Sequence, residues 1–407
     1  MKYKNWHLGA VIGAAYAAIF IPLIAFALSA GIELETGLYV LLPGLLGLLL
    51  GLFIYQTTTR ERSVPYLIVA LAFGTTAGIF SVIDGMDLLP GMHVFLLSLS
   101  LNCSGFEFLF FFLFIEGLRE YRANSVRLVF ACCLALLQSV SLWCIVWFQG
   151  QGEAPSHLWL LADIGYNTLG IFTFLACAAP VYIRTFRLTR EPRSMMLVVA
   201  VILIGMSFIL GSLKDFTDYF AESGDFKSLI SDIASFNDAL ALAGIIILTI
   251  VYVSNVNYLY RLPNDNFALM VSLKTGETIH FVRFKTRSKV DLNQDLLSGL
   301  LSTINSVFQS IMTTSSDIKE ISSKSATLLS ESGRFVTATI ITEKPSAILD
   351  KALKRYVDHF ERMFAVRLGD KSTCVTDYDA AKTLLKKIFP FFVVDEQAPE
   401  VTPHEKK

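Results

Sequence analysis

Eight long apolar stretches occupy the first 260 residues of this chain of 407. A helix needs about 20 apolar residues to cross a bilayer whose hydrocarbon core is about 30 Å thick. The sequence therefore predicts a polytopic bundle of eight transmembrane helices, and it excludes a single soluble domain, a disordered chain and a secreted disulfide scaffold. The predicted spans are approximately residues 8–30, 36–56, 65–83, 93–117, 127–149, 157–183, 195–213 and 234–257.

Charged residues are distributed unevenly along the chain. Residues 1–260 carry 13 Lys and Arg and 17 Asp and Glu. The shorter segment 261–407 carries 21 Lys and Arg and 18 Asp and Glu. We therefore expect a transmembrane domain over residues 1–260, a soluble α+β domain over residues 265–390, and a disordered tail over residues 391–407. The net charge of −1 gives no indication of nucleic-acid binding.

Positive charges lie in alternate joints between the predicted spans. One set of joints holds eleven Lys and Arg residues, whereas the other set holds two and is otherwise acidic. Because short cytoplasmic loops carry the excess of Lys and Arg, this pattern predicts that both chain ends lie in the cytoplasm, with the spans in the plasma membrane. The eleven residues are Lys2, Lys4, Arg60, Arg62, Arg119, Arg122, Arg127, Arg184, Arg187, Arg190 and Arg193.

The first apolar stretch follows Lys2 and Lys4, a pattern that a secretory signal peptide shares. Its length, from Leu8 to Ala30, exceeds the about 7–15 residues usual for the apolar part of such a peptide. We therefore expect a retained first helix.

Glycines recur at four-residue spacing in three of the spans. Such pairs let helix backbones approach closely in lipid, so we expect packing within the bundle, with homodimerisation as the alternative. The pairs are Gly9 with Gly13, Gly47 with Gly51, and Gly74 with Gly78.

Polar and ionisable residues occur within the predicted spans, nearly all in their outer halves. Such residues are costly in a bilayer and mark functional sites by default, so we predict an outward-opening ligand pocket between helices. The alternatives are hydration at the membrane surface and structural bridges between helices. The candidate pocket residues are Asp84, His93, Asn102, Glu107, Asp163, Asn167, Asp215, Asn237 and Asp238.

No pattern of catalytic, cofactor-binding or metal-ligating residues is visible. The six cysteines show no C-x-x-C spacing, and the chain contains no P-loop, GxGxxG, HExxH or GxSxG pattern in its soluble part. We therefore expect no enzyme activity, no cofactor and no metal. The membrane region resembles the multi-span sensory modules of prokaryotic receptors in layout.

The soluble part alternates strand and helix patterns. Strands are predicted at residues 267–273, 278–285, 317–322, 325–331 and 334–343, with turns at Lys274–Glu277 and Ser332–Gly333. Helices are predicted at about 294–312, after Pro345, and from Thr376, whose spacing to Asp379 matches a capping box, to a point before Pro390. One antiparallel five-stranded sheet with helices packed on it would bury these apolar faces.

This order of elements, with RFVTATIITEKPS leading into an amphipathic helix, resembles the longin and roadblock families of profilin-like domains, in particular their archaeal versions. The resemblance covers residues 267–364 and extends at most to residue 390. It implies a non-catalytic module that dimerises or binds small GTPases and signalling partners through its sheet edge and helix faces.

A basic run follows the second predicted strand. Its residues alternate, so they share one face of an extended chain. They would either keep a solvated edge from aggregating or contact anionic lipid headgroups. The run comprises Arg283, Lys285, Arg287 and Lys289.

The sequence therefore favours a membrane receptor or sensor whose outer pocket senses a small ligand or the state of the membrane, and whose cytoplasmic domain binds a partner such as a small GTPase. A membrane-anchored scaffold for such partners and a transporter with a regulatory domain are the alternatives. The transmembrane domain is expected to contact the lipid bilayer.

Overall fold

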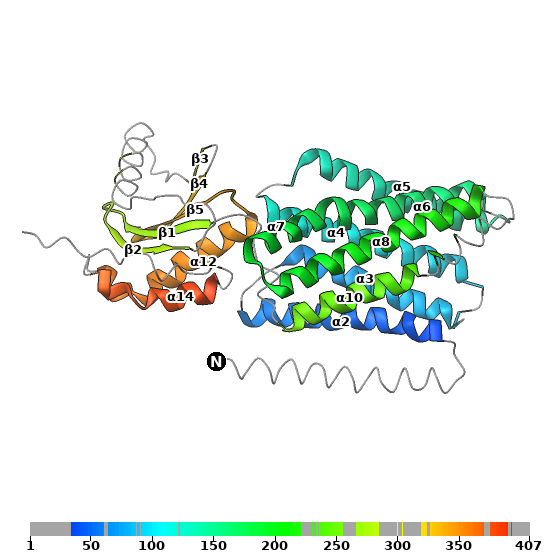
Figure 1. The fold of residues 1–407 in the computed structure, drawn as a ribbon, viewed down its shortest axis with the longest axis horizontal. Helices are drawn as coiled ribbons and strands as arrows, with labels where there is room; N and C mark the ends of the chain where they lie inside the picture. The colour runs from blue at the N-terminus through cyan, green and yellow to red at the C-terminus, as the bar shows by residue number, and fades with distance from the viewer. Residues whose placement is uncertain are drawn as a thin grey trace, which may run out of the picture. The chain divides into compact units, whose positions relative to one another are not determined.

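Long apolar helices form the first part of the structure, a computed structural model, and a β-sheet with helices forms the last part (Figure 1). The chain divides into two compact units, one of residues 1–116 with 123–259 and the other of residues 117–122 with 260–407. We refer to these as the helical unit and the C-terminal unit. The structure describes residues 34–60, 64–86, 88–89, 91–120, 123–152, 154–220, 230, 233–234, 236–254, 266–284, 299, 303, 319–323, 326–369, 375–389 and 392.

Six helices in the described residues are long and apolar enough to cross a membrane, as expected of a multi-pass membrane protein. Among them, one crossing is a composite of α6, the π-helical segment η1 and α7. The six are α3 (Pro65–Gly85), α4 (His93–Arg119), α5 (Ser125–Gln149), the composite of α6 (Ser156–Ile171), η1 (Phe172–Ala178) and α7 (Ala179–Thr189), α8 (Pro192–Phe220) and α10 (Asn237–Ser254). The unit also contains α2 (Leu34–Arg60).

The eight predicted spans are therefore recovered in part. The first, residues 8–30, lies outside the described residues. The second corresponds to α2, whose residues Leu41–Tyr55 form an apolar segment.

Successive helices of the bundle run in opposite directions, so the connections alternate between two ends (Figure 1). We call the end that holds the connections α3–α4 and α5–α6 the α3–α4 end, and the opposite one the α4–α5 end.

Aromatic side chains of α4 fill the interior of the helical unit. Phe108 of α4 forms edge-to-face contacts with Phe174 of η1 and Phe208 of α8, with ring centroids 5.7 and 5.0 Å apart. On another face of α4, Phe110 stacks on Phe73 of α3. Rings of this size fill the space between helices whose backbones lie apart. Helix α4 therefore contacts several neighbouring helices through its side chains.

The π-helical segment η1 precedes Pro180. Proline has no N–H for the carbonyl four residues earlier, and its ring displaces that carbonyl. A wider helical turn accommodates this loss without ending the helix. The composite helix therefore continues from Ser156 to Thr189.

The predicted five-stranded antiparallel sheet of the C-terminal unit is confirmed, with strand order β2-β1-β5-β4-β3. The β1–β2 turn forms where expected, with Gly276 at a φ of +94° that favours glycine. The strands are β1 (Asn266–Leu273), β2 (Thr278–Arg283), β3 (Glu320–Ser322), β4 (Thr327–Ser332) and β5 (Val336–Thr342).

Helix α12 (Ala347–Met363) packs against β4, β5 and α14 (Ala381–Ile388). It begins after Ser346, whose side chain accepts a hydrogen bond from the Leu349 amide, and its apolar face is buried at helical spacing. The short helix α13 (Ala365–Gly369) follows it.

The predicted start of the last helix at Thr376 is wrong. Residues Val375–Tyr378 form the 3₁₀ turn η3, and α14 begins at Ala381 after Ala380, which provides no side-chain cap. The capping-box pattern therefore does not operate here, because η3 buries Tyr378 against Phe360 instead. The predicted helix at 294–312 and the tail at 391–407 lie almost entirely outside the described residues.

Candidate functional site

Polar side chains from four helices gather in the half of the helical unit nearer the α3–α4 end. Glu107 comes from the middle of α4, and the others come from the first half of α6, the last turns of α8 and the first turn of α10. We call this group the polar cluster. Its members are Glu107, Asp163, Tyr166, Asn167, Asp215, Asn237 and Asp238.

Asn167 links three of these helices. Its side-chain amide donates a hydrogen bond of 2.7 Å to Asp215, which joins α6 to α8. Between them, Gly211 of α8 leaves room for two amides, since a Cβ placed there would lie 3.1 Å from Asn167 Oδ1 and 3.5 Å from Asn237 Nδ2. The first turn of α10 therefore reaches the same point.

Tyr166 connects the outer part of the cluster to its deepest member. Its hydroxyl group shares a side-chain hydrogen bond with Ser104 of α4, and it lies within electrostatic reach of Glu107, Asp163 and Asp238. These groups come from three helices, so a change in the charge of any one acts on the same tyrosine.

Glu107 is the deepest carboxyl group of the cluster. It lies over Gly74 of α3, where a methyl group would overlap the carboxyl group. Within the described part of the chain, no hydrogen bond or ion pair engages the Glu107 carboxyl group. A carboxyl group in such surroundings is expensive for the protein to keep charged, which is typical of groups that titrate or bind a ligand in membranes.

Exposure falls from the end of the bundle towards Asn167, whereas Glu107 is half-buried. Asp238 is exposed, Asp163 and Asp215 are half-buried, and Asn167 is buried. Asp163, Asp215 and Asp238 place three carboxyl groups in this part of the helical unit, so the cluster favours a positively charged group. Beyond Glu107, the rings around Phe108 fill the interior.

The remaining predicted pocket residues lie apart from the cluster. Asp84 Oδ1 and His93 Nδ1 share a hydrogen bond of 2.8 Å between the end of α3 and the start of α4, with the His93 side chain 70% exposed. Asn102 is buried in α4, and no hydrogen bond in the described ranges joins it to the cluster. Six of the nine predicted residues are thus brought together.

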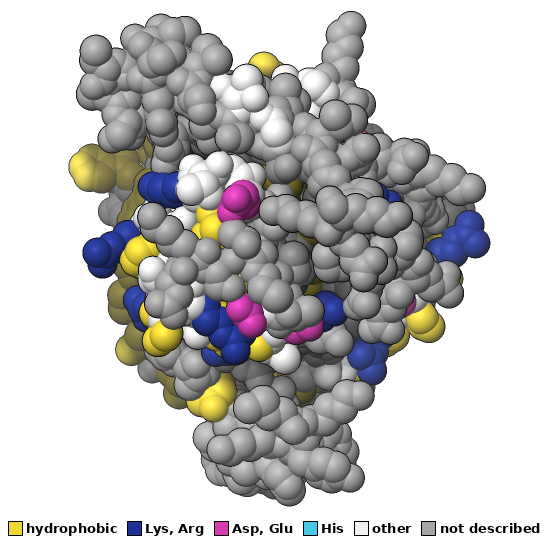
Figure 2. All heavy atoms as spheres, turned by 90° about the vertical axis from the view of Figure 1, so that its left-hand side faces the viewer, with side chains coloured by type: hydrophobic (Ala, Val, Ile, Leu, Met, Phe, Trp, Pro, Cys, Tyr) yellow, Lys and Arg dark blue, Asp and Glu magenta, His cyan; other side chains and the backbone are white. Residues whose placement is uncertain are grey.

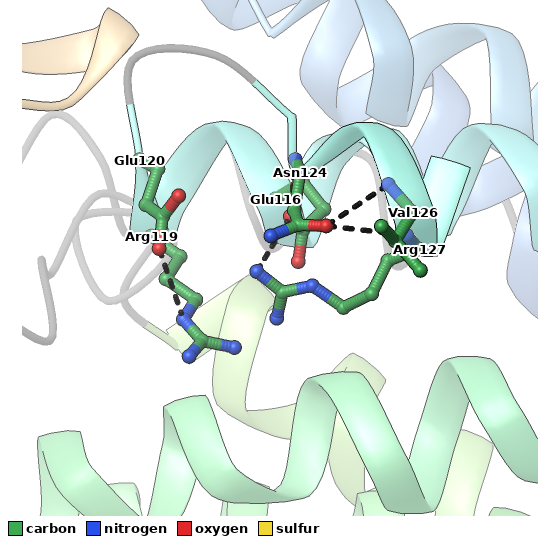
Figure 3. Close-up of polar contacts among 6 residues, drawn as sticks. All are labelled: Glu116, Arg119, Glu120, Asn124, Val126 and Arg127. Atoms are coloured by element: carbon green, nitrogen blue, oxygen red, sulfur yellow. Dashed lines mark hydrogen bonds and ion pairs between the residues drawn. The ribbon is translucent and has the colours of Figure 1, made fainter. Parts of the chain in front are cut away.

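A buried ion pair at the α4–α5 end was not predicted from the sequence. Glu116 of α4 is fully buried, and its Oε2 lies 3.2 Å from Arg127 Nη2 of α5 and accepts a hydrogen bond from the Asn124 amide (Figure 3). Asn124 in turn caps α5 by accepting from the Val126 and Arg127 amides. The signal in the sequence was an ionisable residue near the end of the span predicted at 93–117, next to a basic joint.

Gln138 was also missed, although a glutamine within an apolar run is visible in the sequence. It is buried between Gly105 of α4 and Gly165 of α6, and its Nε2 donates to the Leu101 carbonyl oxygen at 2.6 Å. This contact ties α5 to α4 through a backbone group.

Only Arg283 of the predicted basic run is described. Strand β2 ends at this residue, and its guanidinium group lies 5.9 Å from the centre of the Phe281 ring. Lys285, Arg287 and Lys289 lie outside the described residues. On the face drawn in Figure 2, the described Lys and Arg side chains are spread among acidic ones and form no single patch.

His280 is a buried ionisable group of the C-terminal unit. Burial against α12, assisted by the charge of Lys382, lowers the pKa of His280 to about 4. Its Nε2 has no hydrogen-bond partner in the described part of the unit. The side chain is therefore neutral at physiological pH and belongs to the core.

The described residues contain no group of three His, Cys, Asp or Glu side chains placed to hold a metal ion. Comparison with protein families, with curated proteins and with solved structures gives no match. The helical unit with its polar cluster and the five-stranded sheet are thus the features on which a functional proposal can be based.

Proposed function

We propose that the protein is a multi-pass membrane receptor or sensor. In this proposal, the polar cluster faces the outside and responds to a small ligand or to the state of the membrane. The C-terminal unit lies in the cytoplasm and binds a signalling partner such as a small GTPase.

The observation that carries the proposal is the meeting of Asn167, Asp215 and Asn237 around Gly211. It joins α6 and α8 to the first turn of α10, the last helix before β1 among the described residues. A ligand that binds two arrangements of these helices differently shifts their populations, and α10 would carry that shift towards the sheet.

The filling of the interior beyond Glu107 favours a sensor over a transporter. Phe108, Phe174 and Phe208 contact one another there. A transport path needs polar or water-accessible surface on both sides of the midplane, whereas a sensor needs access from one side only.

The proposed partner follows from the resemblance of the C-terminal unit to longin and roadblock domains. The five strands and the helix after Ser346 occur in the order on which that resemblance rests. Such domains bind small GTPases, so the unit is proposed to do the same.

The proposal can be tested with the full-length protein in lipid nanodiscs and a panel of purified small GTPases, each loaded with GDP or with a GTP analogue. Affinities are compared for the wild type, Asp163→Asn and Glu107→Gln. Asp84→Asn is the matched control, because Asp84 lies outside the polar cluster and is hydrogen-bonded to the exposed His93.

We expect one class of GTPase to bind, with a severalfold change in affinity in the cluster variants and no change in Asp84→Asn. Binding that is identical in all four proteins would rule out sensing through the cluster. Equal binding by the C-terminal unit fused to one unrelated transmembrane helix would instead support a scaffold.

A further inference from the structure

The turn between α7 and α8 has an unusual backbone. Helix α7 ends at Thr189, α8 begins at Pro192, and Arg190 between them has a φ of +52°. Among the described residues, it is the only non-glycine residue with a positive φ. A left-handed residue at this position is usually glycine, because a Cβ makes the conformation strained.

Hydrogen bonds hold this turn in place. The Arg190 amide donates to the Phe186 carbonyl oxygen at 2.7 Å, and the Thr189 and Ser194 hydroxyl groups are 2.9 Å apart. The Ser194 amide donates to the Glu191 carbonyl oxygen at 3.1 Å, and Ser194 itself is buried. The surrounding contacts therefore fix the strained residue rather than letting it relax.

The same turn concentrates positive charge. Four exposed arginines lie within ten residues, with Glu191 as the single acidic residue among them. In the described part of the chain, no hydrogen bond or ion pair engages the side chains of Arg187 and Arg190. The four are Arg184, Arg187, Arg190 and Arg193.

The position of the turn along the helices matters as much as its charge. One spanning segment runs to Arg187 and the next begins at Pro192. The arginines therefore lie where the hydrocarbon of a bilayer ends, which is the depth of the lipid phosphates.

We propose that the α7–α8 turn is a binding site for the phosphate-bearing headgroup of an anionic membrane lipid, with Arg187 and Arg190 as its contacts. A guanidinium group matches a phosphate group with two parallel hydrogen bonds. Positive charge in the connection is enough to orient the helices in the membrane, and the other three arginines would supply it if position 190 were glycine. Orientation alone therefore does not explain a strained arginine at this position. The proposal rests on α7 and α8 crossing a membrane and is independent of sensing by the polar cluster.

Arg190→Gly separates binding from folding. Glycine relieves the left-handed strain, so this variant should be at least as thermally stable as the wild type. Arg187→Gln removes the second contact, and Lys214→Gln is the charge-matched control, because Lys214 is exposed near the opposite end of α8.

Binding is measured by native mass spectrometry of the full-length protein with dioctanoyl phosphatidic acid, and with dioctanoyl phosphatidylcholine for comparison. Each lost arginine contact should weaken phosphatidic acid binding about fivefold, and the double variant should lose about thirtyfold. Phosphatidylcholine binding and the Lys214→Gln variant should be unaffected.

Three results would overturn the proposal. The first is unchanged phosphatidic acid binding in Arg190→Gly. The second is an equal loss in Lys214→Gln, which would indicate general attraction of charge. The third is displacement of the lipid by inorganic phosphate at low concentration, which would indicate a soluble phosphate ligand.

Discussion

The side chain of Asn167 donates a hydrogen bond of 2.7 Å to Asp215, and this bond connects α6 to α8 within the polar cluster. Hydrogen bonds between helices in a membrane contribute about 1 kcal/mol each. This energy is small compared with the free energy of ligand binding. In the proposed sensor, the bond can therefore be formed in one state of the bundle and broken in the other.

Gly78→Ala should destabilise the helical unit, because its methyl group would overlap Pro43 of α2, whose ring cannot swing away. Overpacking of this kind costs about 1–3 kcal/mol. Gly51→Ala is the control, since a Cβ there meets nothing within 4 Å, and it should be neutral or stabilising by up to about 1 kcal/mol. Thermal unfolding in one detergent compares the two, and equal effects would show that Gly78 is not closely packed.

Arg127→Met should be among the most damaging single changes at the α4–α5 end. It leaves the carboxyl group of the fully buried Glu116 without its ion-pair partner, which costs about 3 kcal/mol. Arg119→Met removes a more exposed arginine, 3.7 Å from Glu120, and should cost less than about 1 kcal/mol. Unfolding free energies that rank the two the other way would contradict the buried pair.

Tyr182 of α7 and Tyr252 of α10 share a buried hydroxyl–hydroxyl hydrogen bond of 2.9 Å. Either single Tyr→Phe change leaves one buried hydroxyl group unpaired, at a cost of about 1–3 kcal/mol. The double Phe variant removes both groups and should recover part of that loss. A double-mutant cycle of unfolding free energies measures the coupling, and strictly additive losses would show that the bond contributes nothing.

The C-terminal unit should lose stability as the pH falls from about 6.5 to about 4. Over this range the unfolded chain binds a proton at His280, whereas the folded unit, with a pKa of about 4, does not. The stabilisation is therefore complete above the unfolded pKa and is lost below it, by about 3 kcal/mol in total.

His280→Phe should flatten this dependence, whereas His359→Gln, at a partly exposed position on α12, should leave it unchanged. Amide hydrogen exchange of β1 and β5 in the full-length protein, corrected for the intrinsic rate at each pH, measures it. A His280→Phe variant that keeps the wild-type dependence would contradict the assignment to His280.

Length and periodicity were sufficient to predict most helices and strands. The span predicted at 93–117 is α4 at His93–Arg119, and the strand predicted at 334–343 is β5 at Val336–Thr342. Both depend on local pattern. The thickness of a bilayer sets the length of the helix, and the alternation of side chains identifies the strand. Thr376 shows the limit, because tertiary packing of Tyr378 determines the local structure there.

The candidate site was less accessible to prediction, because contacts between helices cannot be read from spacing. Polarity at membrane depth gave six of the seven residues that gather around Asn167 and Tyr166, but it could not show that Asp84 and His93 pair separately. Glu116 was not singled out, although it is an ionisable residue near the end of the span predicted at 93–117. Of the glycines at four-residue spacing, Gly78 lies close to Pro43 of α2 and Gly74 close to the Glu107 side chain, whereas a Cβ at Gly51 would meet nothing within 4 Å.

Coupling between the polar cluster and the sheet is the central claim, and hydrogen exchange in β1 tests it most directly. The full-length protein in nanodiscs is compared with a double variant, Glu107→Gln with Asp163→Asn, and with the Asp84→Asn control. A sensor predicts that amide protection in Asn266–Leu273 changes in the double variant and not in the control. Identical β1 protection in all three proteins, with the cluster variant folded, would contradict it.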